Sequence, residues 1–464
     1  EASWPGEACP SSSPRPLGSC GMAGTPPGSV GASEEPAFPN LRRGVATWSM
    51  VFSLLVRDQS PCREESPPSP AKLATNGRRI SAKQSPPAPW WCLSILSPTG
   101  LENIATHQYK GGKYTPLDNV LNPVWLWFTE KLPMWVAPNL VTFTGLGPLC
   151  VVYGVTCYVN PRTDTPNPSW LLLVSAATTW FYQTLDAMDG KQARRTGSST
   201  PLGQLFDHGC DCLASIIHCS QAHAVLAPGG NISGLLGTTL FQFGFFLAQW
   251  EEFHTGVLQT SAGPVGVTET QYVLIIMLLG GGIMGHDKLV KFLADPSLLL
   301  GSMSNLSIDI QCGLCFFFLI MIATCFNRTF RATYASGKLG QALAQLLPVV
   351  VIQASAVCMS REARVQEAQF VFLIVGLHFF FITVQMIIFS MAKQDFPVFQ
   401  LGTLVPLVTM TWLTHYVDAE LCHQLMAGYS AVLGAYLLWW SCSVIRQITS
   451  KLKIEVFRIK PKAK

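Results

Sequence analysis

DAMDGKQARRTGSSTPLGQLFDHGCD, residues 186–211, is a polar stretch between two strongly apolar runs of the chain. It holds four aspartates, two at the end of the first run and two at the start of the second. Charged groups within a membrane are costly unless they face a cavity, an ion or one another. The stretch therefore predicts a functional site between two membrane helices.

The spacing of these aspartates predicts a metal site. Asp186 and Asp189 are three residues apart, and Asp207 and Asp211 are four apart, so each pair lies on one face of its helix. Two such helices facing each other would direct four carboxylates into one pocket, where they repel unless cations neutralise them. Oxygen ligands suit Mg²⁺ or Mn²⁺, and two ions together clamp the oxygens of a transferring phosphate. We therefore expect two Mg²⁺ or Mn²⁺ ions at this site.

Small and basic residues in the same stretch indicate a ligand that carries phosphate. Gly190 and Gly203 have no Cβ and Ala193 has only a methyl group, so a phosphate or sugar can approach the backbone closely. The basic residues that can hold the phosphate charge are Lys191, Arg194 and Arg195. Helix capping alone would explain one or two of the aspartates, but not four in register.

The pattern D-x2-D-G-x2-A-R-x8-G-x3-D-x3-D runs through the stretch without a departure. Its fixed positions are Asp186, Asp189, Gly190, Ala193, Arg194, Gly203, Asp207 and Asp211. This pattern resembles the signature of the CDP-alcohol phosphotransferases, and the fuller strings LDAMDGKQARRT and STPLGQLFDHGCD are similar to those of the eukaryotic choline/ethanolamine phosphotransferases. The resemblance implies an enzyme that moves phosphocholine or phosphoethanolamine from CDP-choline or CDP-ethanolamine to diacylglycerol. It would form phosphatidylcholine or phosphatidylethanolamine, release CMP and act as a homodimer.

Two further strings extend the resemblance. WVAPNLVT at 135–142 resembles the entry to the first span of family members, which implies that Asn139 approaches the nucleotide. A plain helix start with Pro138 near the first turn is the alternative. WEEFHTG at 250–256 resembles a segment of fungal and plant members and makes Glu251, more than Glu252, the expected contact near the headgroup ammonium. Solvated acids at a helix end are the alternative there.

A base must remove the proton of the lipid hydroxyl, and two residues are candidates. His208 has an ordinary pKa close to neutrality, whereas Asp211 is the last acid of the motif. A carboxylate bound to a metal is a poor proton acceptor, which favours His208 slightly. On an ideal helix His208 lies about 100° around from Asp207, so it can point past the pocket.

The composition predicts a polytopic membrane protein. Of the 464 residues 49% are hydrophobic and only 12% are charged, about half the charged share of soluble domains. The net charge of +4 is too small to indicate nucleic-acid binding. The 15 cysteines are scattered without paired spacing and are expected to behave as small apolar residues.

We divide the chain into four parts. Residues 1–100 are rich in Pro, Ser and Gly and are predicted to form a disordered extension. Residues 101–134 combine aromatic residues with lysines, which predicts an interfacial amphipathic segment. Residues 135–447 form the predicted transmembrane domain, and residues 448–464 form a basic tail expected in the cytosol.

About ten transmembrane helices are expected in the membrane domain. The apolar segments are 138–159, 169–188, 205–227, 234–253, 271–285, 308–327, 340–359, 370–392, 398–416 and 424–445. Most reach the roughly 20 residues that a helix needs to cross a bilayer. Because they lack the alternation of a barrel, they can satisfy their backbone hydrogen bonds only as helices. The predicted fold is an all-α bundle preceded by the interfacial helix.

The distribution of basic loops predicts the orientation. An even number of spans places both chain ends on one side, and most basic loops fall on that side, which makes it cytosolic. The site would then open to the cytosol, where CDP-alcohols are found. The last five residues fit a K-x-K-x-x pattern with Lys460 and Lys462, which resembles a retrieval signal for the endoplasmic reticulum; residence there or in the Golgi is expected. A basic tail lying on anionic lipid headgroups is the alternative.

Two other functions compete with this interpretation. A phosphatidylinositol or phosphatidylglycerophosphate synthase would need a further basic pocket for the acceptor phosphate, and none is evident beyond Arg194 and Arg195. A membrane transporter would be expected to carry internal repeats, whereas the DGxxAR string occurs once. The choice between choline and ethanolamine stays open.

Overall fold

The computed structural model describes residues 95–163, 165–226, 232–262, 265–294, 306–360 and 368–459. The predicted disordered extension lies outside these residues as far as position 94, and so do Lys460 and Lys462 of the C-terminal pattern. All elements below belong to the described residues.

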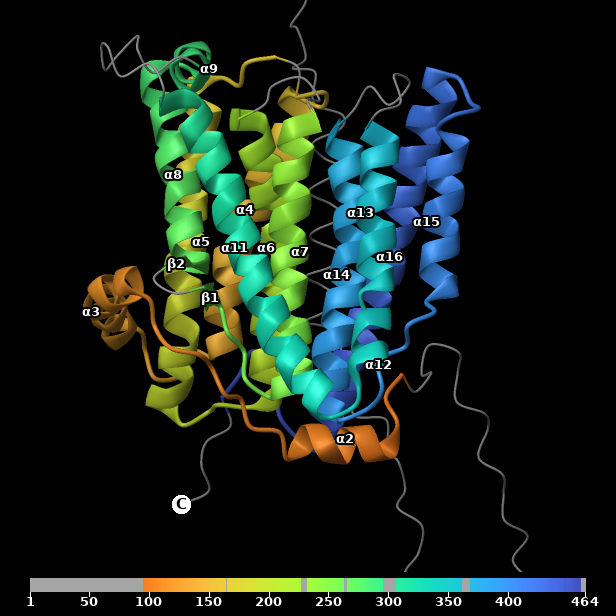
Figure 1. The fold of residues 1–464 in the computed structure, drawn as a ribbon. Coiled ribbons are helices and arrows are strands. Elements are labelled where there is room, and N and C mark those ends of the chain that lie inside the picture. The colour runs from red at the N-terminus through yellow and green to blue at the C-terminus, as the bar shows by residue number, and fades with distance from the viewer. Residues whose placement is uncertain are drawn as a thin grey trace, which may run out of the picture. The chain divides into compact units, whose positions relative to one another are not determined.

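Ten helices run along one bundle, in the order in which the apolar segments were predicted (Figure 1). They are α4 (Pro138–Val159), α5 (Ser169–Thr196), α6 (Pro201–Leu226), α7 (Ile232–Thr255), α8 (Val267–Met284), α11 (Leu306–Ala335), α13 (Leu347–Ser360), α14 (Ala368–Ala392), α15 (Leu401–Leu413) and α16 (Ala419–Leu452). The shorter elements are α2 (Pro98–Ala105), α3 (Pro116–Lys131), α9 (His286–Ala294), α12 (Leu339–Ala344) and the two-residue strands β1 (Ser261–Ala262) and β2 (Val265–Gly266). The two strands form a small antiparallel hairpin.

The all-α membrane fold is confirmed, whereas the number of spans stays a prediction. Within the described residues, five helices are long and apolar enough to cross a membrane: α4, α8, Leu339–Met359 across α12 and α13, α14 and α16. α15 is apolar but shorter. α5 and α6 carry the charged residues of the motif, which lowers their hydropathy without changing their place in the bundle.

α14 forms the centre of the larger hydrophobic core. It is apolar all round, as expected of a helix buried on every side, and it packs against α6, α7, α13 and α16. Its single histidine, His378, is fully buried and satisfied, since Nδ1 lies 2.8 Å from the carbonyl oxygen of Ile374 and Nε2 lies 3.0 Å from the hydroxyl of Tyr429.

Close helix crossings depend on glycines of α8. At Gly282 a Cβ would lie 2.6 Å from the side chain of Leu173 and 3.2 Å from the carbonyl oxygen of Ser169, both on α5. Only a residue without a side chain allows α8 to approach α5 this closely. The Gly-rich character of this predicted segment is therefore explained by packing.

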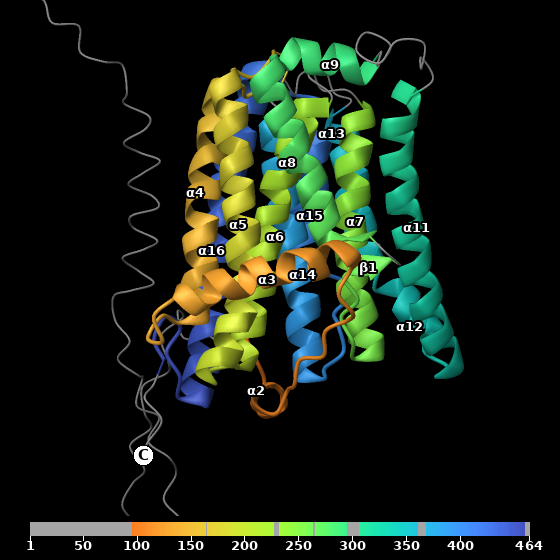
Figure 2. The same cartoon turned by 90° about the vertical axis from the view of Figure 1, so that its left-hand side faces the viewer.

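α2 and α3 precede the bundle and lie at an angle to it. Figure 2 shows α3 lying across the long helices, against α5. Thr115 and Asp118 form a capping box at its start, and its apolar residues Val120, Val124 and Trp127 are exposed. An exposed apolar face fits the predicted interfacial helix, which stays a prediction because the structure contains no membrane.

The two described ends of the chain meet at one end of the bundle. Gln447 Oε1 on α16 accepts a hydrogen bond of 3.1 Å from the backbone N–H of Ile95. Lys451 forms an ion pair with Glu102 of α2. α9 lies at the opposite end (Figures 1 and 2). Ends on the same side agree with an even number of passes through the bundle.

Candidate active site

The turn between α5 and α6 places the motif aspartates opposite one another. α5 ends at Gly197, which adopts the left-handed conformation (φ 63°) that terminates many helices. α6 begins at Pro201, and the Thr200 hydroxyl accepts a hydrogen bond of 3.1 Å from the backbone N–H of Gly203. The chain thus reverses within a few residues, and α6 runs back along α5.

Three aspartates come together across this turn. Carboxylate oxygens of Asp186, Asp207 and Asp211 all lie within 4.8 Å of one another, and the three residues are partly buried. Oδ1 of Asp186 and Oδ1 of Asp207 are buried and accept no hydrogen bond. Oδ1 of Asp211 accepts one of 2.9 Å from the hydroxyl of Tyr182. Converging oxygens without partners are the donor set that a divalent cation requires, so the residues fit the predicted metal site.

Asp189 faces the same region but is held differently. The Thr142 hydroxyl of α4 donates a hydrogen bond to Asp189 Oδ2, and Asp189 is only 7% exposed. It does not belong to the group of three oxygens within 4.8 Å. The fourth carboxylate of the predicted set therefore stays a prediction as a metal ligand.

Two cavities meet at the aspartates, with volumes of about 430 Å³ and about 610 Å³. We call them the nucleotide-side cavity and the core cavity. The residues that line both are Tyr109, Asp189, Gly190, Arg194, Asp207 and His208. Molecules bound in the two cavities can therefore meet beside Asp189 and Asp207.

The nucleotide-side cavity of about 430 Å³ contains several predicted binding residues. Asn139, Ala193 and Gly203 line it, together with residues 454–459 of the tail. Asn139 Nδ2 donates a hydrogen bond of 3.0 Å to the carbonyl oxygen of Val456. A Cβ at Gly190 or Gly203 would meet its nearest protein atom at 3.5 Å, an ordinary contact. The packing of the described residues does not require these glycines, and their predicted role in close approach of a ligand stays a prediction.

The core cavity of about 610 Å³ extends between α5, α6, α7 and α11. Asp186, Asp211 and Lys191 line it. The Lys191 ammonium donates to the carbonyl oxygen of Ala187 at 2.9 Å and lies 4.8 Å from the centre of the Trp125 ring. The opposite wall, from α7 and α11, is apolar and includes Phe241, Phe245, Phe318 and Met321.

His208 lies inside the site. Its side chain lines both cavities and is only 6% exposed. Nε2 lies 4.0 Å from Oδ2 of Asp207, and Nδ1 has no hydrogen-bond partner. The edge of the imidazole faces the Tyr109 ring, with ring centres 5.7 Å apart. Although His208 is expected about 100° around the helix from Asp207, its side chain still lines both cavities.

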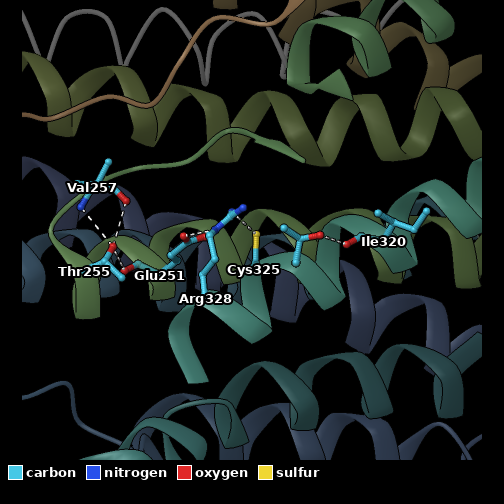
Figure 3. Close-up of polar contacts among 7 residues, drawn as sticks. Glu251, Thr255, Val257, Ile320, Cys325 and Arg328 are labelled. Carbon is cyan, nitrogen blue, oxygen red and sulfur yellow. Dashed lines mark hydrogen bonds and ion pairs between the residues drawn. The ribbon is translucent and has the colours of Figure 1, made fainter. Parts of the chain in front are cut away.

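Glu251 lies elsewhere than its sequence context indicates. Figure 3 shows Arg328 of α11 directed at the Glu251 carboxylate, with contacts of 2.5 Å from Nε and 2.7 Å from Nη2. Glu251 is 2% exposed and lines neither cavity. A buried carboxylate needs a cation partner, and Arg328 provides one. The expected contact of Glu251 with the substrate has no support in this geometry.

Arg195 is also occupied by the protein itself. Its guanidinium donates to the carbonyl oxygens of Thr129, Glu130 and Leu132, the closest at 2.7 Å. These carbonyls end α3, where cations are favourable. Arg195 therefore fixes α3 to α5, and Arg194 and Lys191 are the motif cations that line a cavity.

Residues before α3 contribute to the site and were not predicted from the sequence. His107 Nε2 lies 2.9 Å from Gln204 Oε1, and Gln204 Nε2 donates to Glu252 at 3.1 Å. This network holds the segment that carries Tyr109 over the carboxylates. Burial, followed by the nearby charge of Asp207, raises the pKa of the Tyr109 phenol. Burial likewise lowers the pKa of His107.

The family model described as CDP-alcohol phosphatidyltransferase matches residues 135–291, which include every motif residue of the site. This stretch of the chain therefore carries the domain of the CDP-alcohol phosphatidyltransferase family. The chain is 36% identical over 199 residues to Cholinephosphotransferase 1 of Gallus gallus, covering 43% of this chain and 59% of the relative. Over 195 residues it is 38% identical to Uncharacterized CDP-alcohol phosphatidyltransferase class-I family protein 3 of Dictyostelium discoideum, covering 41% and 48%.

A longer match supports the same family. Cholinephosphotransferase 1 of Xenopus laevis is 28% identical over 376 residues, which cover 78% of this chain and 90% of the relative. Matches at higher identity cover about half of the relatives' length, from 47% to 59%. These comparisons support the predicted family over residues 135–291, whereas the activity and the substrates of this chain are proposals.

Proposed function

We propose that this chain transfers phosphocholine or phosphoethanolamine from CDP-choline or CDP-ethanolamine to the hydroxyl of diacylglycerol and releases CMP. The observation that carries the proposal is the group of Asp186, Asp207 and Asp211, which lines the core cavity and reaches the nucleotide-side cavity at Asp207. A donor that carries a diphosphate and an acceptor that carries acyl chains need two compartments that meet at one reactive point.

The three aspartates would hold the divalent cations, with Asp189 as a fourth ligand. When bound, Mg²⁺ or Mn²⁺ neutralises the diphosphate and makes CMP a better leaving group. Two divalent ions balance the charge of four carboxylates better than one ion does. The buried, unpartnered oxygens of Asp186 and Asp207 support this assignment.

The donor would lie with its nucleotide in the nucleotide-side cavity. Asn139, Ala193 and Gly203 line that cavity, and Gly190 and Arg194 line both cavities. Arg194 is thus placed to hold the diphosphate where the cavities meet, and Lys191 lies on the core side. The glycines allow the phosphates to approach the backbone of α5 and α6.

His208 would act as the base in the transfer. The lipid hydroxyl oxygen forms a bond to the phosphorus that carries the choline or ethanolamine. The bond between this phosphorus and the bridging oxygen breaks, and CMP leaves with both electrons of that bond. An unpartnered ring nitrogen of His208 takes the hydroxyl proton. Asp211 is the weaker candidate, because Tyr182 and the other two aspartates already engage it.

The cellular setting is proposed on the same basis. We place the enzyme in the membrane of the endoplasmic reticulum or the Golgi, with the site open to the cytosol, and as a homodimer. Both described chain ends meet at the end of the bundle where the tail lines the nucleotide-side cavity, which supports placing the tail and the site on one side of the membrane. The compartment and the homodimer rest on the resemblance to the family.

The decisive experiment is a product assay on the full-length chain purified in detergent. CDP-choline and CDP-ethanolamine are supplied side by side with diacylglycerol and Mg²⁺, and labelled phospholipid is measured. We expect product from at least one donor, and its loss in Asp207→Asn. The absence of phospholipid from both donors, with a correctly folded protein, would refute the proposal.

A further inference from the structure

A second polar cluster lies in the core cavity, beyond the aspartates. Asp211, Ser215 and His218 are spaced four and three residues apart, so they lie on one face of α6. All three line the core cavity. Gln183 of α5 and Gln249 of α7 line it as well. The helices α5, α6 and α7 therefore direct uncharged polar groups into the core cavity, whose lining also includes the apolar side chains of α7 and α11 named above.

The polar atoms of this cluster are buried without partners. His218 is 5% exposed, Gln183 is 3% exposed and Gln249 is 4% exposed. His218 Nε2, Gln183 Oε1 and Gln249 Oε1 form no hydrogen bond within the described structure. Buried polar groups are normally hydrogen-bonded, because leaving one unpaired is costly. The cluster therefore keeps hydrogen-bonding capacity for a ligand in the cavity: the two amide oxygens lack a donor, and the imidazole nitrogen lacks any partner.

One tyrosine contacts both this cluster and the reactive aspartates. The Tyr182 hydroxyl donates to Asp211 at 2.9 Å, and the rings of Tyr182 and His218 form an edge-to-face pair with centres 6.0 Å apart. Asp211 and His218 lie on one face of α6, about 10 Å of helix rise apart. The cluster is therefore about two helical turns along α6 from Asp211.

We propose that His218, Gln183 and Gln249 form a subsite for the ester-bearing neck of the acceptor lipid. The proposal rests on the proposed function, because the acceptor hydroxyl must reach the aspartates. In a diacylglycerol the ester carbonyls are a few bonds from that hydroxyl, so a lipid whose hydroxyl reaches the aspartates can carry its carbonyls toward this cluster. The imidazole N–H and the NH2 groups of the amides can donate to these carbonyls, whereas the amide oxygens can accept only from a donor such as the lipid hydroxyl. The phenylalanines of α7 and α11 can pack against the acyl chains. The chemistry of the site favours esters over ethers.

The test compares diacylglycerol with a dialkylglycerol of the same chain length, which keeps the hydroxyl and lacks both carbonyls. Binding is measured first, as the lipid-dependent rise in melting temperature of the full-length protein in detergent, which needs no turnover. We expect the wild type to bind the diacylglycerol at least about fivefold more tightly, the usual effect of one hydrogen bond.

Substitution of His218 measures how much this residue contributes to the preference for diacylglycerol over dialkylglycerol. His218→Phe should lower the affinity for diacylglycerol about fivefold and leave the affinity for dialkylglycerol unchanged, so that the preference largely disappears. His218→Gln retains a donor and should restore part of it. Ile217→Val, a neighbouring change in the core that lines neither cavity, should keep the wild-type preference.

Two outcomes would overturn the subsite: equal binding of both lipids by the wild type, or an unchanged preference in His218→Phe. Either one would mean that water alone fills the cluster. Failure of the proposed function is a separate result. It would appear as an intact binding preference without phospholipid product from either CDP-alcohol.

Discussion

His208→Ala is the change that tests the proposed mechanism most directly. The side chain lines both cavities and leaves Nδ1 without a partner, while its nearest carboxylate oxygen, on Asp207, is 4.0 Å away. Because it makes no close contact with the group of three aspartates, its loss should leave metal and donor binding nearly intact. A positioned base contributes about 10²–10⁴-fold to the rate, or about 3–5 kcal/mol of barrier. We therefore expect kcat to fall by that factor, with KM for the CDP-alcohol changed less than about threefold.

The control for this prediction is Asp211→Asn, measured with the same product assay across a range of Mg²⁺. It changes one of the three converging carboxylates and the acceptor of the Tyr182 hydroxyl. We expect weaker metal binding and therefore lower activity, which added Mg²⁺ partly restores. If His208→Ala keeps near-normal kcat while Asp211→Asn is inactive at saturating Mg²⁺, Asp211 is the base and the assignment of His208 is wrong.

Three further predictions follow from other parts of the structure. Excess EDTA should abolish product formation, and Mg²⁺ or Mn²⁺ should restore it, since the converging carboxylates alone would repel the diphosphate. Full activity in EDTA would contradict a metal site. Arg328→Met should destabilise the protein by about 2–4 kcal/mol in thermal unfolding, because Glu251 stays buried without its partner. Adding Glu251→Gln should recover part of this loss of stability. No recovery would show that the ion pair is not the cause. Gly282→Ala should lower the free energy of unfolding by about 1–3 kcal/mol, because the added Cβ forces α8 away from Leu173. Gly280→Ala should be nearly neutral, because the nearest atom to its added Cβ is 3.6 Å away. Equal effects of the two substitutions would refute the packing argument.

Much of the site could be predicted because its information is local. The spacing of the aspartates fixes which of them share a helix face, and the turn at Gly197 is short enough that α5 and α6 must lie side by side. The apolar runs on both sides allow only helices in a membrane. The metal-binding chemistry and the all-α fold therefore follow from residues close together in the sequence.

Other features depend on partners far along the chain. The sequence predicts Glu251 as a contact near the headgroup, with a solvated acid at a helix end as the alternative, but it pairs with Arg328, which lies 77 residues later. Asp189 belongs to the motif, yet a hydroxyl of α4, 47 residues earlier, holds one of its oxygens. Tyr109 precedes the motif by a long interval and still covers His208.

The sequence by itself determined the helices, the motif and the chemical nature of the site, because helix periodicity and burial of apolar residues act between near neighbours. Only the tertiary structure decided which polar groups are already satisfied and which remain available to a ligand. Arg195 and Arg194 are adjacent in the sequence, but one binds the end of α3 and the other lines both cavities. The physical reason is that a hydrogen bond or ion pair is set by the position of its partner, and helix packing brings together partners that no local pattern records.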